Sequence, residues 1–113
     1  MFKLSANPTY TAPVKVDMPT DNGKTIQKTF EAKFKRLTQT ELDDLQKRVS
    51  SGDLGDDAFV SEVLVGWSGV QDDDGNELEF NPKNLASALD VYPVRPSIIR
   101  AFYDTIKTAK TKN

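Results

Sequence analysis

The fold is decided by residues 14–37, which read VKVDMPTDNGKTIQKTFEAKFKRL. Apolar and polar residues alternate along Val14–Met18, which is the period of a half-buried β-strand. Asn22-Gly23 is a pair preferred in tight hairpin turns, because both central positions of such a turn need a positive φ. Alternation then resumes and places on one face Ile26, Phe30, Ala32 and Phe34. The stretch predicts an antiparallel hairpin, and Phe2 and Leu4 are candidates for a third short strand.

About four short helices are predicted after the hairpin. Thr38 and Glu41 fit a capping box, in which each side chain satisfies a free backbone N–H at the start of a helix. The later helices are expected at about residues 56–65, from Asn81 with Pro82 in the first helical position, and at about residues 96–109. The sequence therefore predicts an α+β fold with one domain over residues 1–113, in which a hairpin or small sheet packs on the helices.

The composition argues against catalysis and metal binding. The 113 residues include neither Cys nor His, which excludes disulfides and thiolate metal sites and removes the commonest metal ligand and general base. No nucleophile elbow, phosphate-binding loop or dinucleotide fingerprint occurs. We therefore predict a protein that is not an enzyme and takes no cofactor or metal. With no apolar run long enough to span a bilayer and no leader after Met1, a cytoplasmic location is expected.

Charge is distributed unevenly, although its net value is only −2. Residues 24–36 hold five bases and one acid (+4), residues 37–80 two bases and twelve acids (−10), and residues 81–113 six bases and two acids (+4). Two interpretations stay open: an ordinary solvated surface, or a dipolar molecule that associates weakly with its own copies, head to tail. A basic strand face with Lys28, Lys33 and Lys35 leaves a small nucleic-acid-binding module as an alternative function.

An acidic segment lies between the second and third helices, where residues 67–80 read WSGVQDDDGNELEF. Apolar residues bracket the acids, which predicts a small hairpin with a polar tip. Three residues have the alternate spacing of a calcium-binding loop, namely Asp72, Asp74 and Asn76. Such a loop needs Gly at its sixth and Glu at its twelfth position, and Glu77 and Lys83 stand there instead. A solvated turn is therefore favoured over a calcium site.

The same region resembles the tail assembly chaperones of long-tailed bacteriophages of the siphovirus type. The resemblance rests on residues 65–70 (VGWSGV), the acidic turn 72–75 (DDDG), residues 80–85 (FNPKNL) and residues 98–103 (IIRAFY) of the last helix. The order of the predicted elements agrees with that family over the whole chain. The motif combines a buried Trp, a turn glycine and a helix cap, so it is structural and carries no chemistry.

The resemblance implies a non-enzymatic protein that binds and solubilises the tape measure protein and helps to recruit tail tube subunits. Such chaperones act in the host cytoplasm during tail assembly and are absent from the mature virion. Many also occur in a longer form made by a programmed frameshift. The alternative within phage assembly is a head–tail connector, or another tail morphogenesis protein, that stays in the virion.

Six apolar side chains are the candidate partner contacts: Trp67, Val70, Ile98, Ile99, Phe102 and Ile106. The last four form a wide apolar stripe on the fourth helix, which suits helix-on-helix contact. Trp67 is expected to pack between the second helix and the hairpin of residues 70–80, and an exposed anchor for a partner is the alternative. Packing inside the domain competes with partner contact for these residues.

Overall fold

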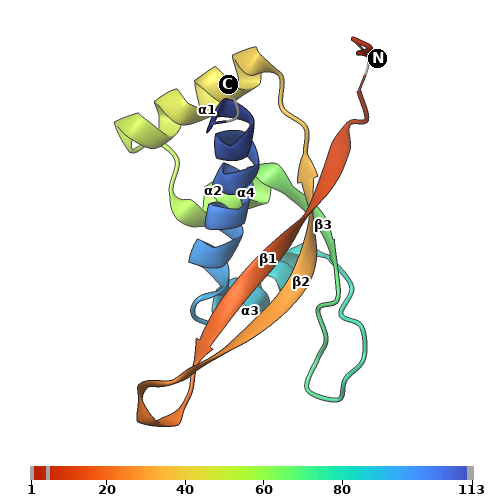
Figure 1. The fold of residues 1–113 in the computed structure, drawn as a ribbon, viewed down its shortest axis with the longest axis vertical. Helices are drawn as coiled ribbons and strands as arrows, with labels where there is room; N and C mark the ends of the chain where they lie inside the picture. Colours follow the sequence, from red (N-terminus) through yellow and green to blue (C-terminus); the bar gives the residue numbers. More distant parts are fainter. Residues whose placement is uncertain (1, 5, 112–113) are drawn as a thin grey trace.

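The computed structural model describes residues 2–4 and 6–111, with side chains as far as Lys107. Its elements are the strands β1 (Thr9–Pro19), β2 (Thr25–Lys35) and β3 (Leu64–Ser68) and the helices α1 (Gln39–Ser51), α2 (Asp56–Val63), α3 (Pro82–Leu89) and α4 (Val94–Thr111). The strands form one antiparallel sheet in the order β1-β2-β3, and α2 and α4 cover one of its faces (Figure 1). The predicted α+β fold is therefore confirmed.

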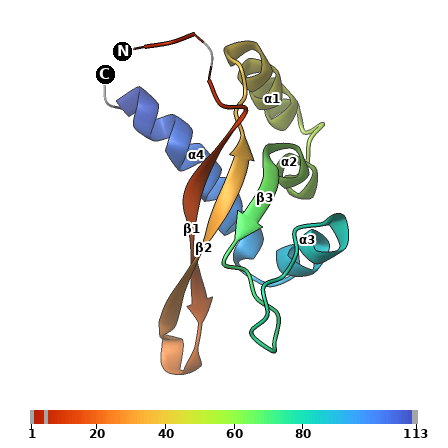
Figure 2. The same ribbon diagram turned by 90° about the vertical axis from the view of Figure 1, so that its right-hand side faces the viewer.

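The β1–β2 hairpin is the largest part of the sheet and pairs without a break from Thr9 to Lys35. Even-numbered residues of both strands face the helices and odd-numbered residues face solvent, as the sequence alternation predicts. Asn22 and Gly23 have φ angles of 64° and 73°, which confirms the predicted turn. The turn end of the hairpin extends past the helices along the molecule's long axis of 45 Å (Figure 1, Figure 2).

The third strand is not where the sequence pattern places it. Residues 64 and 65 are predicted to end the second helix, but Leu64 has φ −94° and ψ 120° and opens β3, which pairs with β2. Phe2 and Leu4 lie outside the sheet and are 85% and 95% exposed. The reason is physical: β2 has a second edge whose backbone groups need partners, and the branched and aromatic residues of 64–68 suit a strand.

The core lies between the sheet and the helices α2 and α4, and Phe102 of α4 is at its centre. Its ring centroid is 5.4 Å from that of Phe34 on β2 and 5.6 Å from that of Phe59 on α2, both in edge-to-face geometry. Such pairs add about 0.5–1.5 kcal/mol each beyond the burial of area. Val14 and Ile98 complete the cluster with no exposed surface. These contacts fix α4 on the inner face of the hairpin.

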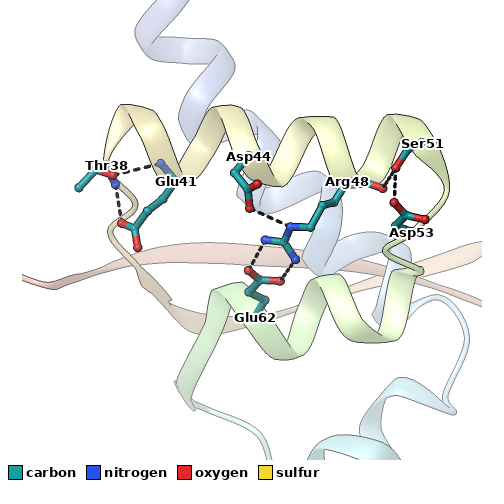
Figure 3. Close-up of polar contacts among 7 residues, drawn as sticks. All are labelled: Thr38, Glu41, Asp44, Arg48, Ser51, Asp53 and Glu62. Carbon is teal, nitrogen blue, oxygen red and sulfur yellow. Dashed lines mark hydrogen bonds and ion pairs between the residues drawn. The ribbon is translucent and has the colours of Figure 1, made fainter.

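The first helix, α1, is joined to α2 by the guanidinium group of Arg48 (Figure 3). Both of its terminal nitrogens donate to the Glu62 carboxylate, at 3.0 and 2.6 Å, and its Nε donates to Asp44 at 2.9 Å. The hydrogen bonds from Arg48 lower the pKa of Glu62, and those to Glu62 and Asp44 raise the pKa of Arg48. Because these side chains are partly exposed, the group orients the two helices more than it stabilises them.

The starts of α1 and α3 match the predicted caps. Thr38 Oγ1 accepts from the Glu41 N–H at 3.1 Å, and Glu41 Oε1 accepts from the Thr38 N–H at 2.9 Å (Figure 3). That hydrogen bond from the Thr38 backbone is the main cause that lowers the pKa of the Glu41 carboxyl. In α3, Asn81 Oδ1 accepts from the Asn84 N–H at 2.8 Å, and Pro82 occupies the first helical position.

The Arg48–Glu62 link predicts a pH-dependent change in stability. Because the pKa of Glu62 is lowered in the folded state, its charged form stabilises the fold above the unfolded pKa, and this contribution is lost as pH falls through the folded value. Glu62→Gln should therefore lower the melting temperature near pH 7 and change it little near pH 3. Thermal unfolding across this range is the measurement, with Glu79→Gln as the control. An equal difference at both pH values would contradict the link.

The position of Phe102 predicts a large loss of stability on truncation. Phe102→Ala removes a ring that is 1% exposed and packed against two other rings, so it should cost about 3–5 kcal/mol of unfolding free energy. Urea unfolding followed by circular dichroism measures this loss. Phe2→Ala is the matched control because Phe2 is 85% exposed, and it should leave stability within about 0.5 kcal/mol. A small loss for Phe102→Ala would mean that α4 is not fixed by this ring.

Candidate protein-binding surfaces

A hollow with apolar walls, which we call the hairpin groove, lies past the end of β3, toward the hairpin turn. In this part the sheet consists of β1 and β2 alone. The groove has a volume of about 230 Å³. Its apolar lining comes from all three strands, from the chain after β3, and from α3 and α4, and consists of Val16, Met18, Phe30, Trp67, Val70, Ala88 and Val94. In both views the turn end of the hairpin and the chain after β3 diverge around this region (Figure 1, Figure 2). The groove therefore exposes apolar side chains between two projecting hairpins.

Trp67 forms one wall of the hairpin groove and connects three segments. Its indole Nε1–H donates to the Leu78 carbonyl at 2.8 Å. Its ring meets that of Phe80 edge-on at 5.0 Å and that of Phe30 at 6.4 Å, centroid to centroid. The predicted packing against the hairpin of residues 70–80 is confirmed, but on its other side the ring meets Phe30 of β2, where the second helix was predicted. Trp67 is half-buried, so part of its surface stays available in the groove.

The acidic segment forms the predicted small hairpin, with a bridge between Gln71 and Glu77. Asp72 Oδ1 accepts hydrogen bonds from the backbone N–H groups of Asp74 at 2.9 Å and Asn76 at 3.0 Å. This carboxylate therefore shapes the turn. Among residues 2–4 and 6–111, no group of three or more potential metal ligands is brought together.

A second hollow, which we call the helix wedge, lies between α1 and α4. Its volume is about 330 Å³, and Leu42, Tyr103 and Ile106 supply its apolar surface. Gln46 Nε2 donates to the Tyr103 hydroxyl at 3.2 Å and so ties α1 to α4. The Tyr103 ring stacks on that of Phe59 at 5.5 Å, which anchors it to the core.

The six predicted contact residues separate into two groups. Ile98 and Phe102 are 0% and 1% exposed and belong to the core, so they present no surface to a partner in the folded chain. The other four are half-buried. Trp67 and Val70 line the hairpin groove, Ile106 lines the helix wedge, and Ile99 lies one helical turn before Tyr103 of the wedge. As partner contacts, these four residues stay predictions.

The structure adds residues that the sequence pattern does not single out as contacts. Met18 and Phe30 enter the groove because the hairpin extends beyond the helices, and Leu42 enters the wedge because α1 crosses α4. The predicted basic strand face is wrong, because Lys28 has an even number and faces the groove, whereas Lys33 and Lys35 lie on the opposite face of β2. The alternation of apolar and polar residues along β2 already indicates that Lys28 lies on the opposite face from Lys33 and Lys35.

A family model described as YdaY prophage protein matches residues 21–111, which include most of both surfaces. The chain belongs to the YdaY prophage protein family. The phage origin implied by the resemblance is thereby confirmed at the level of a prophage protein. No match to this YdaY family member was found among curated proteins or among solved structures. Over the parts of the chain that the structure describes, no helix is long and apolar enough to cross a membrane.

Trp67 predicts two different losses of stability in this YdaY family protein. Trp67→Phe keeps an aromatic ring but removes the donor to the Leu78 carbonyl, so it should cost about 1 kcal/mol of unfolding free energy. Trp67→Ala also removes the contacts with Phe30 and Phe80. Its loss of unfolding free energy should lie toward the lower end of the range of about 3–5 kcal/mol for such truncations. Urea unfolding followed by circular dichroism measures both. Equal stability of Trp67→Ala and the wild type would show that Trp67 does not hold the acidic hairpin.

Proposed function

We propose that this prophage protein is a non-enzymatic tail assembly chaperone, which binds the tape measure protein of its phage and keeps it soluble until tail tube subunits replace it. The observation that carries the proposal is the helix wedge, a hollow between two helices in which Leu42, Tyr103 and Ile106 form an apolar floor among polar side chains. Membership of a prophage family and the resemblance to tail assembly chaperones support it.

The wedge suits a helical client. Tape measure proteins are long and largely helical, and the apolar stripes of such helices cause aggregation when they are exposed. A helix laid between α1 and α4 would place its stripe on Leu42, Tyr103 and Ile106, in the helix-in-groove mode of recognition. Tyr103 is held in place by Gln46 and Phe59, so the wedge does not need to reorganise to accept a client.

The charges around the wedge are of both signs. Asp43 of α1 and Lys107 of α4 both line it, and the nearby acids Glu41 and Asp44 are paired with Lys35 and Arg48. The bound chaperone would cover the client's stripe with polar surface and add net negative charge, which opposes aggregation.

Co-expression with the tape measure protein of the same phage tests the proposal. The wild type should hold that protein in the soluble fraction and copurify with it. Ile106→Lys places a charge in the wedge and should reduce both effects by about tenfold or more, as the loss of a buried interface contact does. Val65→Lys is the matched control, because Val65 is exposed and lies outside the wedge. A longer frameshifted form, where the genome encodes one, is tested in parallel.

Two results would overturn the proposal. If neither form changes the solubility of the tape measure protein or copurifies with it, the chaperone function is wrong. If mass spectrometry finds the protein in purified virions at the copy number of a structural subunit, it is a connector or another virion component. A wild-type effect that Ile106→Lys and Val65→Lys leave equally intact would keep the chaperone function but place the contact elsewhere.

A further inference from the structure

The two long strands of the sheet differ in how their outer edges are protected. The hydrogen bonds from Thr20 N to Lys24 O and from Arg36 N to Pro8 O lie at even-numbered pairs of the β1–β2 ladder. In an antiparallel ladder, bonded pairs alternate with pairs whose backbone groups face outward. The backbone N–H and C=O groups of the odd-numbered residues of β1 therefore point away from β2. These residues include Pro13 and Pro19. Proline offers no N–H, so the β1 edge resists an added strand.

The turn half of β2 has no such protection. Its odd-numbered residues Thr25, Gln27 and Thr29 direct their N–H and C=O groups away from β1, and all three are exposed. The paired part of β3 begins opposite Glu31, so it does not reach these positions. Gly69, with φ 82°, turns the chain out of the sheet at this point. An open strand edge without proline is a template for pairing with another extended segment.

The hairpin groove lies directly beside this open edge. Phe30 and Lys28 of β2 line the groove, together with Met18 of the neighbouring strand and Trp67 at the end of β3. A strand added to the edge would point every second side chain toward the inner face of the sheet, where the groove is. Backbone pairing and an apolar pocket for alternate side chains are the two components of recognition by strand addition.

The chain itself contains a segment with the matching pattern. Phe2, Lys3 and Leu4 alternate apolar and polar residues, and Phe2 and Leu4 are 85% and 95% exposed. This segment cannot reach the groove of its own molecule, because it precedes β1 at one end and the groove lies toward the hairpin turn at the other (Figure 1). The groove begins at Val16 of β1, so residues 9–15 separate the two, which is about 23 Å of strand. Only another copy can bring it there.

Charge in the hairpin next to the groove also favours this occupant, with Lys28 of β2 as the basic residue of the groove lining. The acidic hairpin that borders the groove carries five acids and no base, namely Asp72, Asp73, Asp74, Glu77 and Glu79. Lys3 is the charged residue of the incoming segment. We propose that residues 2–4 of one copy add as a short strand to the Thr25–Thr29 edge of the next, with Phe2 and Leu4 in the hairpin groove. Each copy then offers a segment at one end and a groove at the other, so the contact is head to tail and extends into chains or closes into rings.

The proposal does not depend on the tape measure protein and is tested on the purified chain by sedimentation over a series of concentrations. Wild-type protein should form species that grow with concentration and do not stop at the dimer. Higher salt should weaken the association without abolishing it, because only its ionic part is screened. Leu4→Asp should make the protein monomeric, because it places a charge on the segment that enters the groove of the next copy. Gln27→Pro should do the same by removing an outward N–H of the β2 edge, and it also removes the exposed side-chain hydrogen bond from Gln27 to Asp17. Circular dichroism confirms that each variant folds.

Matched controls separate this contact from other kinds of association. Thr11→Pro makes the same change at an outward position of the β1 edge and should leave association intact. A mixture of Leu4→Asp and Gln27→Pro should form a one-to-one complex that grows no further, because one intact groove meets one intact segment. A wild type that is monomeric at every concentration, association that persists in either variant, or a mixture that stays monomeric would overturn the proposal.

Discussion

The edge-to-face contact of Phe102 with Phe34 and Phe59 is the interaction on which the rest of the structure depends. It joins the last helix to the hairpin and to α2, segments that are far apart in the sequence. Once α4 lies on the inner face, the alternation of β1 and β2 decides which side chains are buried. Tyr103, the next residue, is then directed toward α1, and it becomes part of the helix wedge. Core packing and the candidate client surface therefore share one helix.

The hairpin groove arises from one mismatch, since the hairpin is longer than the helices that cover it. Near the middle of the molecule the inner face of the sheet is filled by Val14, Ala32 and Phe34. Toward the turn the helices end, and the same face continues with Met18 and Ile26, of which Ile26 is 53% exposed. A uniform alternating pattern thus makes core in one half and open surface in the other. The length of a strand relative to its neighbours determines this outcome.

Local signals were enough to predict much of the fold. Alternation predicted the hairpin, Asn22-Gly23 its turn, and Thr38 and Asn81 the starts of two helices, because each depends on neighbours in the sequence. The third strand was missed, since residues 64–68 become a strand only when β2 offers an edge. The same limit applies to the surfaces: Trp67 and Ile106 were proposed as contacts, but Phe30 and Leu42 join them through packing between distant segments. Burial of Ile98 and Phe102 likewise depends on where α4 lies.

The extended shape of the molecule has a consequence for stoichiometry. Its long axis measures 45 Å, and an α-helix rises about 1.5 Å per residue, so one copy is as long as about 30 residues of helix. Copies aligned end to end on a helical client, as the proposed function requires, would each cover about 30 residues of it. The number of copies needed would then grow in proportion to the length of the client, and a longer tail would require more of this protein during a single round of assembly.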